Sequence, residues 1–528
     1  MLSRAVSIEG FRVRLLTRFP ALALVLAAGS AQVTTSQYDN ARTGANLHET
    51  VLTPRNVNAA SFGKVFTLPV DGDIYAQPLY FPQVPIPGKG LHNVLVVATE
   101  HDSVYAFDAD GGSTEPLWHT SFLKSGVTTL TTGDVACPFV TPEIGITSTP
   151  VIDGATGTIY VLARTKESSG LLGTQYVQRL HALAITTGVE KFGGPVEIQA
   201  SVPGRGAGSS NGQVKFNALR DNPRAALLLT HGGVYLSFAS FCDVAPYHGW
   251  VMAYDAGTLK QRGVFNVSPD AEEGGIWLGD TGPAADEQGN IYVPTGNGKF
   301  DAPAGRDYGD SVLKLRLGPS SLDLADFFTP FNQRELNAED NDIGSGGPVL
   351  LPDHLLVVAG KGGTIYLLDR DHLGKFNIGD DRHAVQTIRF RGEYYFGAPA
   401  YWNGHVFSLS SNDWPRDLLL DHRRLTLRAM AGGPRYIDPG ATPTVSANGV
   451  KDGVLWILAS KGWRSPDQPA VLHAYDASDI TKQLYTSDEN RARDQAGRCL
   501  RFAIPTVVNG RVYVGAKREV DVYGLLKD

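Results

Sequence analysis

The chain has 528 residues, of which 42% are hydrophobic, and this length indicates either two to four ordinary domains or one large repeat architecture. The 59 glycines and 31 prolines are typical of a protein with many tight turns and argue against a helix bundle. The formal net charge is -7 and the charges are interspersed. Because the sequence has no basic tract, we expect no nucleic-acid partner.

The first 31 residues have the pattern of an export signal peptide. Four arginines lie between Arg4 and Arg18, an apolar run covers Ala21–Ala28, and the small residues Gly29–Ala31 offer a cleavage site before Gln32. This run is much shorter than the roughly 20 residues that span a bilayer, and no later stretch is long enough. We therefore expect an exported chain, periplasmic or extracellular, without a transmembrane segment after cleavage. An uncleaved membrane anchor is the alternative.

The chain contains three cysteines, Cys137, Cys242 and Cys499. In an oxidising compartment, the simple expectation is one disulfide and one remaining thiol. The sequence has no Cys-x-x-Cys-His motif, which excludes a c-type haem attached to this chain.

Residues 32–60 are polar and rich in turn residues, and we expect them to form an N-terminal arm lying over the body of residues 61–528. In that body, a β-rich repeat is marked by a proline before each short apolar run. The repeat prolines are Pro78, Pro150, Pro223, Pro283, Pro348, Pro399, Pro443 and Pro505. Proline cannot donate a ladder hydrogen bond, so it fits the first residue of a strand. Turn dipeptides such as Asn509-Gly510 then lead into a second run.

A third run in many repeats ends in Asp, and a fourth often ends in an aromatic residue. The third runs end at Asp108, Asp255, Asp369 and Asp476. The aromatic residues are Trp118, Phe192, Phe265 and Phe376. We expect the aspartates to cap turns rather than to catalyse. Four short strands per repeat, repeated about eight times, predict an all-β fold, an eight-bladed β-propeller of four-stranded antiparallel blades.

The last repeat, Arg501 to Leu526, lacks its outer strand, whereas Gly63–Val70 has a strand pattern without a blade. We therefore expect this N-terminal strand to complete the last blade and close the ring, which removes an exposed sheet edge. Two smaller propellers in tandem are the alternative, but neither a linker nor a composition shift divides the chain.

The repeat resembles the quinoprotein repeat, in which a strand ending Ala-x-Asp is followed by Thr-Gly and a tryptophan. Ala106–Trp118 and Ala182–Phe192 carry this pattern loosely. The similarity covers nearly the whole mature chain at low identity. It is closest to the eight-bladed quinoprotein alcohol dehydrogenases, which use pyrroloquinoline quinone (PQQ) and calcium. It extends to secreted relatives without known activity and to the scaffold propeller of the outer-membrane assembly machinery.

The resemblance is most specific in two segments that implicate the cofactors. Gly274–Trp277 is similar to the family segment whose tryptophan lies under the PQQ ring, so Trp277 is expected to stack on the quinone. Thr295–Asn297 matches the Thr-Gly-Asn segment that gives calcium an amide oxygen, so Asn297 is expected to bind the metal and the cofactor.

Further segments suggest the base, the cation and the remaining metal ligands. Glu339–Asp342 resembles the segment of the catalytic aspartate, so Asp340 is the expected base and Asp342 the reserve candidate. Lys361 begins a run similar to the one whose cation contacts the quinone oxygens. Asp243 is the nearest acid before a run that follows the family's acidic calcium ligand. The implied metal ligands are Asp243, Asn297 and Asp340.

Three features depart from the family pattern. The vicinal cysteine pair above the cofactor is missing, Glu339 replaces the tryptophan before the catalytic aspartate, and the tryptophans that dock blades are eroded. Cys137 lies in the region comparable to the missing pair, and Cys242 stands beside Asp243. The resemblance therefore suggests a disulfide between Cys137 and Cys242 on neighbouring blades.

The resemblance implies a secreted dehydrogenase, dependent on PQQ and calcium, that oxidises an alcohol or sugar hydroxyl and passes electrons to an external acceptor. Each motif also has a plain structural interpretation. Trp277 could pack between blades, Asn297 could form a turn, the two aspartates could lie in a polar loop, and Lys361 could be solvated.

Two other functions compete with the dehydrogenase. One is a non-catalytic propeller that binds an envelope protein or a polysaccharide through insertions such as Ser201–Phe216 and Asp488–Gly497. The other is a hydrolase or lyase that uses His248 or His101, for which the sequence shows no Ser/His/Asp or zinc-like spacing.

Overall fold

The computed structural model describes Met1 and residues 31–168, 173–279, 281–390, 394–465 and 467–527. The signal peptide expected over residues 1–31 lies almost wholly outside the described residues. Within these ranges, no helix is both long and apolar enough to cross a bilayer.

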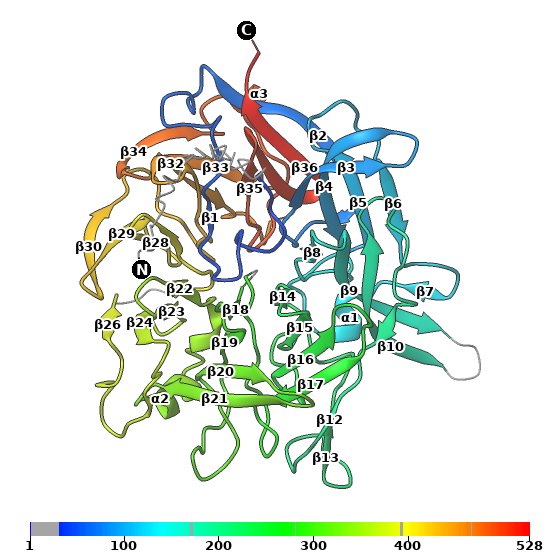
Figure 1. Cartoon of the computed structure of the whole chain (residues 1–528), viewed down its shortest axis with the longest axis vertical. Helices are drawn as coiled ribbons and strands as arrows, with labels where there is room; N and C mark the ends of the chain where they lie inside the picture. The colour runs from blue at the N-terminus through cyan, green and yellow to red at the C-terminus, as the bar shows by residue number, and fades with distance from the viewer. Residues whose placement is uncertain (2–30, 169–172, 280, 391–393, 466, 528) are drawn as a thin grey trace. The chain divides into compact units, whose positions relative to one another are not determined.

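Residues Ala31–Asp528 form eight small antiparallel sheets in a ring, which confirms the predicted eight-bladed β-propeller (Figure 1). The first blade contains β3 (Leu79–Ile86), β4 (Gly90–Thr99), β5 (Ser103–Asp108) and β6 (Trp118–Ser121). The second blade contains β8 (Val151–Asp153), β9 (Thr158–Ser168), β10 (Thr174–Ala184) and β11 (Val196–Glu197). The third blade contains β14 (Leu228–Thr230), β15 (Gly233–Phe238), β16 (Trp250–Asp255) and β17 (Gln261–Asn266). The fourth blade contains β18 (Ala284–Ala285), β19 (Asn290–Pro294), β20 (Val312–Leu317) and β21 (Leu322–Thr329).

The remaining blades complete the circle. The fifth blade contains β22 (Val349–Leu351), β23 (Leu355–Ala359), β24 (Thr364–Asp369) and β26 (Gln386–Arg389). The sixth blade contains β27 (Ala400–Trp402), β28 (His405–Ser408), β29 (Arg416–Asp421) and β30 (Arg424–Met430). The seventh blade contains β31 (Thr444–Asn448), β32 (Lys451–Ala459), β33 (Val471–Asp476) and β34 (Asp479–Thr486). The eighth blade contains β35 (Thr506–Val508), β36 (Arg511–Leu525) and β2 (Phe62–Asp73). Outside this pattern lie β1 (Ala45–Asn46), β7 (Val127–Thr128), β12 (Ser201–Pro203), β13 (Gln213–Lys215), β25 (Lys375–Phe376), α1 (Thr132–Val135), α2 (Gln333–Ala338), η2 (Ile343–Ser345) and α3 (Arg491–Asp494).

The repeat signals have the structural roles that the sequence predicts. Seven of the eight repeat prolines stand directly before the first strand of a blade, whereas Pro223 precedes a short connection to β14. Asp108 Oδ1 accepts the backbone N–H of Asp110 at 3.0 Å, and Asp369 Oδ1 accepts that of Asp371 at 2.8 Å. These aspartates are therefore turn caps, as predicted.

The expectation that aromatic residues end the outer strands is wrong for three blades. Trp118 begins the outer strand β6 instead of ending it. Phe192 lies in a turn, and Phe376 lies in β25, which pairs in parallel with β21 of the preceding blade. The outer strand of the fifth blade is β26, which pairs with β24. The chain after Asp369 thus runs alongside the fourth blade before it returns to complete the fifth.

The N-terminal strand closes the ring, which confirms the prediction for Gly63–Val70. β2 pairs antiparallel with the C-terminal part of β36, and β35 pairs with its N-terminal part. In Figure 1 the blue β2 lies beside the red β36. Asp494, at the end of α3, accepts the backbone N–H of Lys64 in β2 at 3.1 Å. The Asp488–Gly497 insertion therefore supports the closure of the ring.

The segment 33–46, which we expected to lie over the body as an arm, runs along the first strands of all eight blades. Its contacts follow the order of the blades, and β1 lies near the middle of the ring in Figure 1. The segment forms hydrogen bonds, in turn, with Tyr80, Ile152, Leu229, Ala285, Leu350, Tyr401, Val445 and Val507. Arg42 of this segment is fully buried and donates to Pro283 O at 2.9 Å and Leu227 O at 3.2 Å. The segment therefore joins blades that are far apart in the sequence.

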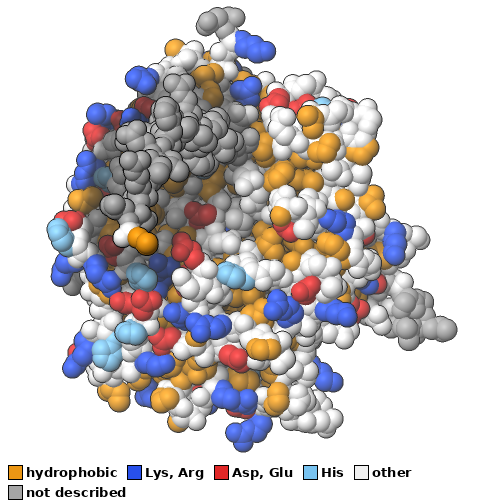
Figure 2. Space-filling model, in the orientation of Figure 1, with side chains coloured by type: hydrophobic (Ala, Val, Ile, Leu, Met, Phe, Trp, Pro, Cys, Tyr) orange, Lys and Arg blue, Asp and Glu red, His pale blue; other side chains and the backbone are white. Residues whose placement is uncertain are grey.

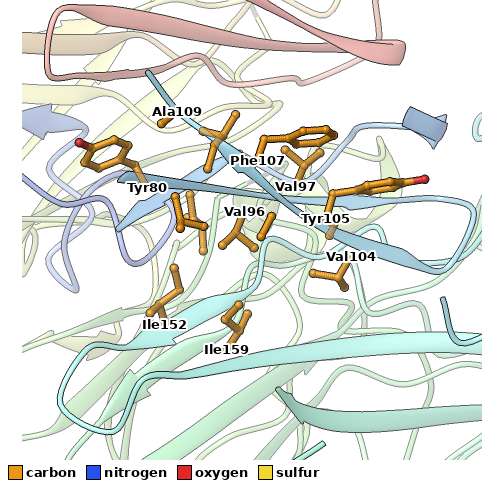
Figure 3. Close-up of a cluster of buried hydrophobic side chains, with 14 of the residues drawn as sticks. Tyr80, Val96, Val97, Val104, Tyr105, Phe107, Ala109, Ile152 and Ile159 are labelled. Atoms are coloured by element: carbon orange, nitrogen blue, oxygen red, sulfur yellow. The ribbon is translucent and has the colours of Figure 1, made fainter. Parts of the chain in front are cut away.

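The hydrophobic core lies within and between the blades. In Figure 3, Ile152 and Ile159 of the second blade face Val96 and Val104 of the first. Burial of such side chains stabilises the fold by roughly 1.5–3 kcal/mol each. On the outside, acidic and basic side chains are interspersed over the face shown in Figure 2, as the sequence predicts.

Candidate functional site

A cavity of about 620 Å³ lies where loops from all eight blades meet. Its lining comes from the loops that enter the first strand of a blade and from those that leave the second strand. Because neighbouring strands of a blade are antiparallel, these two loops lie at the same end of the blade. Residues as distant in sequence as Tyr75 and Phe502 therefore line one cavity.

The structure brings the six predicted site residues together. Five of them line the cavity, and they are Asp243, Trp277, Asp340, Asp342 and Lys361. The sixth, Asn297, lies directly behind this lining, and its Nδ2 donates to Asp340 Oδ1 at 2.8 Å.

Short loops next to blade strands position these side chains. Asp243 follows β15, Trp277 precedes β18, and Lys361 follows β23. The loop between α2 and η2 carries Asp340 and Asp342 to the entrance of β22. These are all loops of one end of the ring, so the spacing of the motifs in the sequence reflects the period of the repeat.

Gly296 explains why the Thr-Gly-Asn segment needs a glycine at its centre. A Cβ atom on this residue would lie 2.5 Å from Asp342 Oδ1 and 2.8 Å from Trp277 Nε1. Without that atom, the backbone comes close enough for the N–H of Asn297 to donate to Asp342 Oδ1 at 2.8 Å. The glycine thus packs the indole, the amide and the carboxylate against one another.

Lys361 lies between the two predicted catalytic aspartates. Its Nζ is 2.8 Å from Asp340 Oδ1 and 2.5 Å from Asp342 Oδ2. The Lys361 side chain is 19% exposed, which excludes the interpretation of a freely solvated lysine. Asp342 is almost fully buried, with 4% of its side chain exposed, whereas 69% of the Asp340 side chain is exposed.

The electrostatics of this cluster follow from burial and pairing. Burial opposes the charge on Lys361, but the attraction of Asp342 and Asp340 is larger, so the pKa of Lys361 is raised. Burial also raises the pKa of Asp342, and Lys361 partly offsets this effect. The backbone of Asp340 is in the left-handed region at a φ of 56°, a conformation that non-glycine residues adopt mainly where the surroundings enforce it.

Trp277 is half-buried and contributes to the cavity wall rather than only to packing between blades. Its ring lies in a T-shaped arrangement with Tyr247 at a centroid distance of 6.5 Å. The indole is held from behind by Gly275 and Gly296, where a Cβ would approach Nε1 to 3.1 Å and 2.8 Å. A fixed, partly exposed indole is suited to stack against a flat ligand.

The structure gives a mixed answer on the predicted metal ligands. Asn297 Oδ1 is buried and has no hydrogen-bond partner among the described residues, so this carbonyl oxygen beside Asp340 fits a hard cation. Asp243 Oδ1 accepts the Tyr247 hydroxyl at 2.7 Å. In the part of the chain that the structure describes, no group of three His, Cys, Asp or Glu side chains converges as a metal centre. The fit to calcium therefore rests on Asn297 and Asp340.

Several residues of this region escaped the sequence analysis. Asp310 is fully buried, and burial together with the nearby Asp342 raises its pKa well above the usual range. Its position two residues before β20 is only a weak signal in the sequence. Arg224, Phe139 and Arg501 also line the cavity, but they come from unrelated loops and share no motif.

The disulfide suggested by the resemblance is present. Cys137 and Cys242 are bonded, with a Cα–Cα distance of 5.6 Å, and both line the cavity. Cys499 is the remaining thiol and is buried.

The histidines of the hydrolase hypothesis have structural roles. His248 is buried. Its Nε2 lies 2.9 Å from Ala207 O, and its Nδ1 lies 3.1 Å from both the carbonyl and the hydroxyl oxygen of Ser268. Burial lowers its pKa. His101 hydrogen-bonds to Glu143 at 2.8 Å. Neither histidine belongs to the cavity lining.

Comparison with solved structures shows the same fold in quinoprotein dehydrogenases. The chain is similar to the quinohemoprotein alcohol dehydrogenase of Comamonas testosteroni, with a TM-score of 0.57 and 14% identity over 94% of this chain and 80% of that one. It is similar to a europium-containing methanol dehydrogenase, with a TM-score of 0.58 and 12% identity over 94% and 98%. BamB from Moraxella catarrhalis gives a TM-score of 0.50 and 12% identity over 88% and 97%. No protein-family profile and no curated protein matches the sequence. The resemblance to the quinoprotein propellers is therefore confirmed for the fold.

Proposed function

We propose that this protein is an exported dehydrogenase that binds PQQ and calcium and oxidises an alcohol or a sugar hydroxyl. The observation that carries the proposal is the convergence of Trp277, Lys361, Asp340 and Asn297 around one cavity of about 620 Å³. This volume is within the usual range of small-molecule sites, roughly 300–1,000 Å³. The shared fold supports the proposal as an analogy.

The side chains match the needs of a planar quinone. Trp277 provides a flat aromatic wall, and Lys361 provides an ammonium group that stabilises developing negative charge on quinone oxygens. When bound, PQQ would supply the two-electron acceptor. Calcium would supply a Lewis acid, and Asn297 Oδ1 and Asp340 would hold it, with Asp243 as the further ligand that the resemblance implies. The proposed reaction would also need an external electron acceptor as a partner.

Asp340 is the better of the two candidates for the base. Its carboxylate is exposed to the cavity, where it can take the proton of a substrate hydroxyl. Lys361 and Asn297 both donate to its Oδ1, which orients the carboxylate. Asp342 is buried and bonded to the backbone of Asn297 and to Lys361, so it positions these two residues.

The test is a titration of the purified mature protein with PQQ, with and without calcium, followed by absorbance and melting temperature. We expect saturable, calcium-dependent binding that Trp277→Ala and Asp340→Asn weaken. Asp371→Asn is the matched control, because Asp371 is an exposed aspartate outside the cavity lining. Binding would be followed by an activity screen of alcohols and sugars with an artificial acceptor. An absence of binding at high micromolar PQQ would refute the proposal.

A second candidate is a non-catalytic propeller that binds an envelope protein or a polysaccharide. The observation in its favour is the β12–β13 hairpin, which projects from the edge of the ring in Figure 1. The similarity in fold to BamB supports this candidate as an analogy. A variant with residues 204–212 replaced by a short turn would separate the candidates, because it should lose a partner without losing PQQ.

A further inference from the structure

A second cluster of buried charged side chains lies outside the cavity lining, where the closing strand β2 meets the first three blades. It contains Asp73 at the end of β2, Glu100 and Asp102 between β4 and β5, and Arg164 in β9. These side chains belong to residues that are at most 4% exposed. Asp221, which is also buried, joins them from the loop before the third blade, because Arg164 Nη2 donates to its carbonyl oxygen at 2.9 Å. We call these five residues the buried acid network.

The network offers too few hydrogen-bond donors for its carboxyl groups to be charged. Glu100 Oε2 accepts the backbone N–H of Gly145 at 2.7 Å, and Asp102 Oδ1 accepts that of Arg164 at 3.3 Å. No hydrogen-bond partner among the described residues reaches Asp73 Oδ2, Glu100 Oε1 or Asp102 Oδ2. A buried carboxylate needs donors at both of its oxygens, whereas a protonated carboxyl group brings a donor of its own.

The balance of charge in the network leads to the same conclusion. Arg164 is its one cation and stands against four carboxyl groups. The Nε and Nη1 atoms of Arg164 have no hydrogen-bond partner in the described part of the chain, so the guanidinium forms no bidentate pair with a carboxylate. It lies instead 4.6 Å from the centroid of the Phe241 ring. One cation cannot neutralise four buried charges, so protonation is the less costly state of the network.

The titratable groups around the network do not supply the missing charge. They are Lys517, Arg518, Glu143, His101 and His248. Lys517 and Arg518 attract Asp73, but burial outweighs them. Glu143 adds one more carboxyl group, and its own partner is His101 at 2.8 Å. His248 reaches the network only through its backbone N–H, which donates to Asp221 Oδ1 at 3.3 Å.

The pKa shifts agree with this geometry. Burial raises the pKa of Asp73 to about 6 and those of Glu100 and Asp221 to about 7. At Glu100, the Gly145 N–H and the Thr147 hydroxyl offset only part of this effect. A carboxyl group whose pKa is raised by folding stabilises the fold most below its unfolded pKa and loses that contribution as the pH rises through its folded pKa. The loss therefore falls between roughly pH 4 and pH 7.

We propose that the buried acid network is a pH-sensitive lock, which protons keep closed in an acidic medium and which loosens β2 and the first three blades as the pH approaches neutrality. The lock borders the cavity, because Phe241, in contact with Arg164, and Asn222, next to Asp221, both line it. One wall of the cavity is therefore held more firmly in acid. The lock involves no cofactor, so it does not depend on the proposed dehydrogenase.

The test is hydrogen exchange of the mature protein without cofactor at pH 5 and pH 7, with each rate divided by the intrinsic rate of the unfolded peptide. Each proton released on opening raises the opening constant about tenfold per pH unit between the unfolded and the folded pKa. Peptides from residues 97–103, 143–147 and 218–224 should therefore open at least about tenfold more at pH 7. Residues 444–459 of the seventh blade contain no buried carboxyl group and should show no such change.

Variants without a titrating group locate the effect. Glu100→Gln keeps the shape of the side chain and an acceptor for Gly145, so the rise in opening between pH 5 and pH 7 should be about tenfold smaller than in the wild type. Asp102→Asn should act in the same direction and provides a second measurement if Glu100→Gln does not fold. Glu115→Gln is the control, because Glu115 is an exposed glutamate of the first blade.

The outcomes separate the lock from the proposed function. Equal opening of the network peptides at the two pH values, or an equal rise in residues 444–459, would overturn the lock. A pH dependence that persists unchanged in both Glu100→Gln and Asp102→Asn would overturn it as well. A titration with PQQ at pH 5, where the lock is closed, tests the dehydrogenase by itself. An absence of PQQ binding there would refute the dehydrogenase and leave the lock in place.

Discussion

Replacement of Lys361 by Met should destabilise the fold, and by more at high pH than at low pH. The change removes an ammonium group that lies 2.8 Å from Asp340 Oδ1 and 2.5 Å from Asp342 Oδ2. Methionine keeps the length of the side chain and its apolar stem, so the loss is confined to the charge. Asp342 then keeps the backbone N–H of Asn297 as a donor but has lost its buried cation.

The size of the effect follows from the burial of the pair. Removal of one partner of a buried ion pair costs about 3–5 kcal/mol. Because Lys361 is 19% exposed and Asp340 is mostly solvated, solvent screening reduces the expected cost to about 2–3 kcal/mol. The entropy of unfolding scales with chain length, so 1 kcal/mol shifts the Tm of a chain of this size by about 1 °C. The expected decrease in Tm is therefore about 2–3 °C near pH 8.

The pH dependence has a definite sign. Burial raises the pKa of Asp342 in the folded state, and Lys361 opposes that shift, so its removal raises this pKa further. A carboxyl group with a raised folded pKa loses its stabilising contribution as the pH rises from the unfolded value through the folded value. At about pH 5 more of Asp342 is protonated in the variant, which removes the unpaired charge, so the deficit shrinks.

Scanning calorimetry at both pH values measures the effect on the wild type, Lys361→Met, Asp342→Asn and the double variant. The double variant should lose less unfolding free energy than the two single variants lose together, because it leaves no buried charge unpaired. Lys482→Met is the control, since Lys482 pairs with Asp479 at 3.0 Å but is 65% exposed. A deficit that is equal at the two pH values, or strict additivity, would refute this account of the cluster.

Three further predictions concern the fold. Arg42→Met should cost about 2–4 kcal/mol because buried carbonyls of two blades lose their donor, whereas Arg55→Met, at an 83% exposed arm residue, should cost almost nothing in the same calorimetry. Gly188→Ala should destabilise the fold by about 1–3 kcal/mol more than Gly193→Ala. Both glycines have a positive φ, but only a Cβ on residue 188 would approach Trp118, at 2.5 Å. Equal decreases in the urea midpoint of the two variants would contradict this packing. Cys137→Ala with Cys242→Ala should cost up to about 4–5 kcal/mol, because the bond closes a loop with a sequence separation of 105, and dithiothreitol should lower the Tm of the wild type alone.

The ring was predictable because its signals are local and repeated. A proline directly before seven of the eight first strands and an aspartate at the end of β5, β16, β24 and β33 depend only on the backbone donors of neighbouring residues. The missing outer strand of the last repeat and the spare strand at Gly63–Val70 then determined the closure. Every one of these features can be recognised in a window of about a dozen residues.

The course of the N-terminal segment was not predictable in the same way. Residues 33–46 have no strand pattern, and their partners are single backbone groups spread from Tyr80 to Val507. Arg42 looks like an ordinary arm residue in the sequence, yet it is fully buried. Phe376 shows the opposite failure, because a local pattern that fits an outer strand is used to extend a neighbouring blade.

The two halves of the cavity differ for a related reason. The half around Lys361 is visible in the sequence because close contacts constrain it, as at Gly296, where a Cβ would collide with Asp342 and Trp277. The half that contains Phe139, Arg224 and Arg501 is built from loops of different blades, and these residues have no fixed spacing in the sequence.

Because the two halves are built differently, substitutions in them should affect the stability of the fold to different extents. Lys361 couples to a buried carboxylate, so its replacement should change both Tm and quinone binding. Arg464 is 67% exposed, lies 3.7 Å from Asp438 and stacks on Trp463, so its replacement should have little effect on Tm. A propeller ring of this kind can therefore change the ligand that it binds through the loops that line the cavity, while the strands and the acidic cluster around Lys361 stay the same.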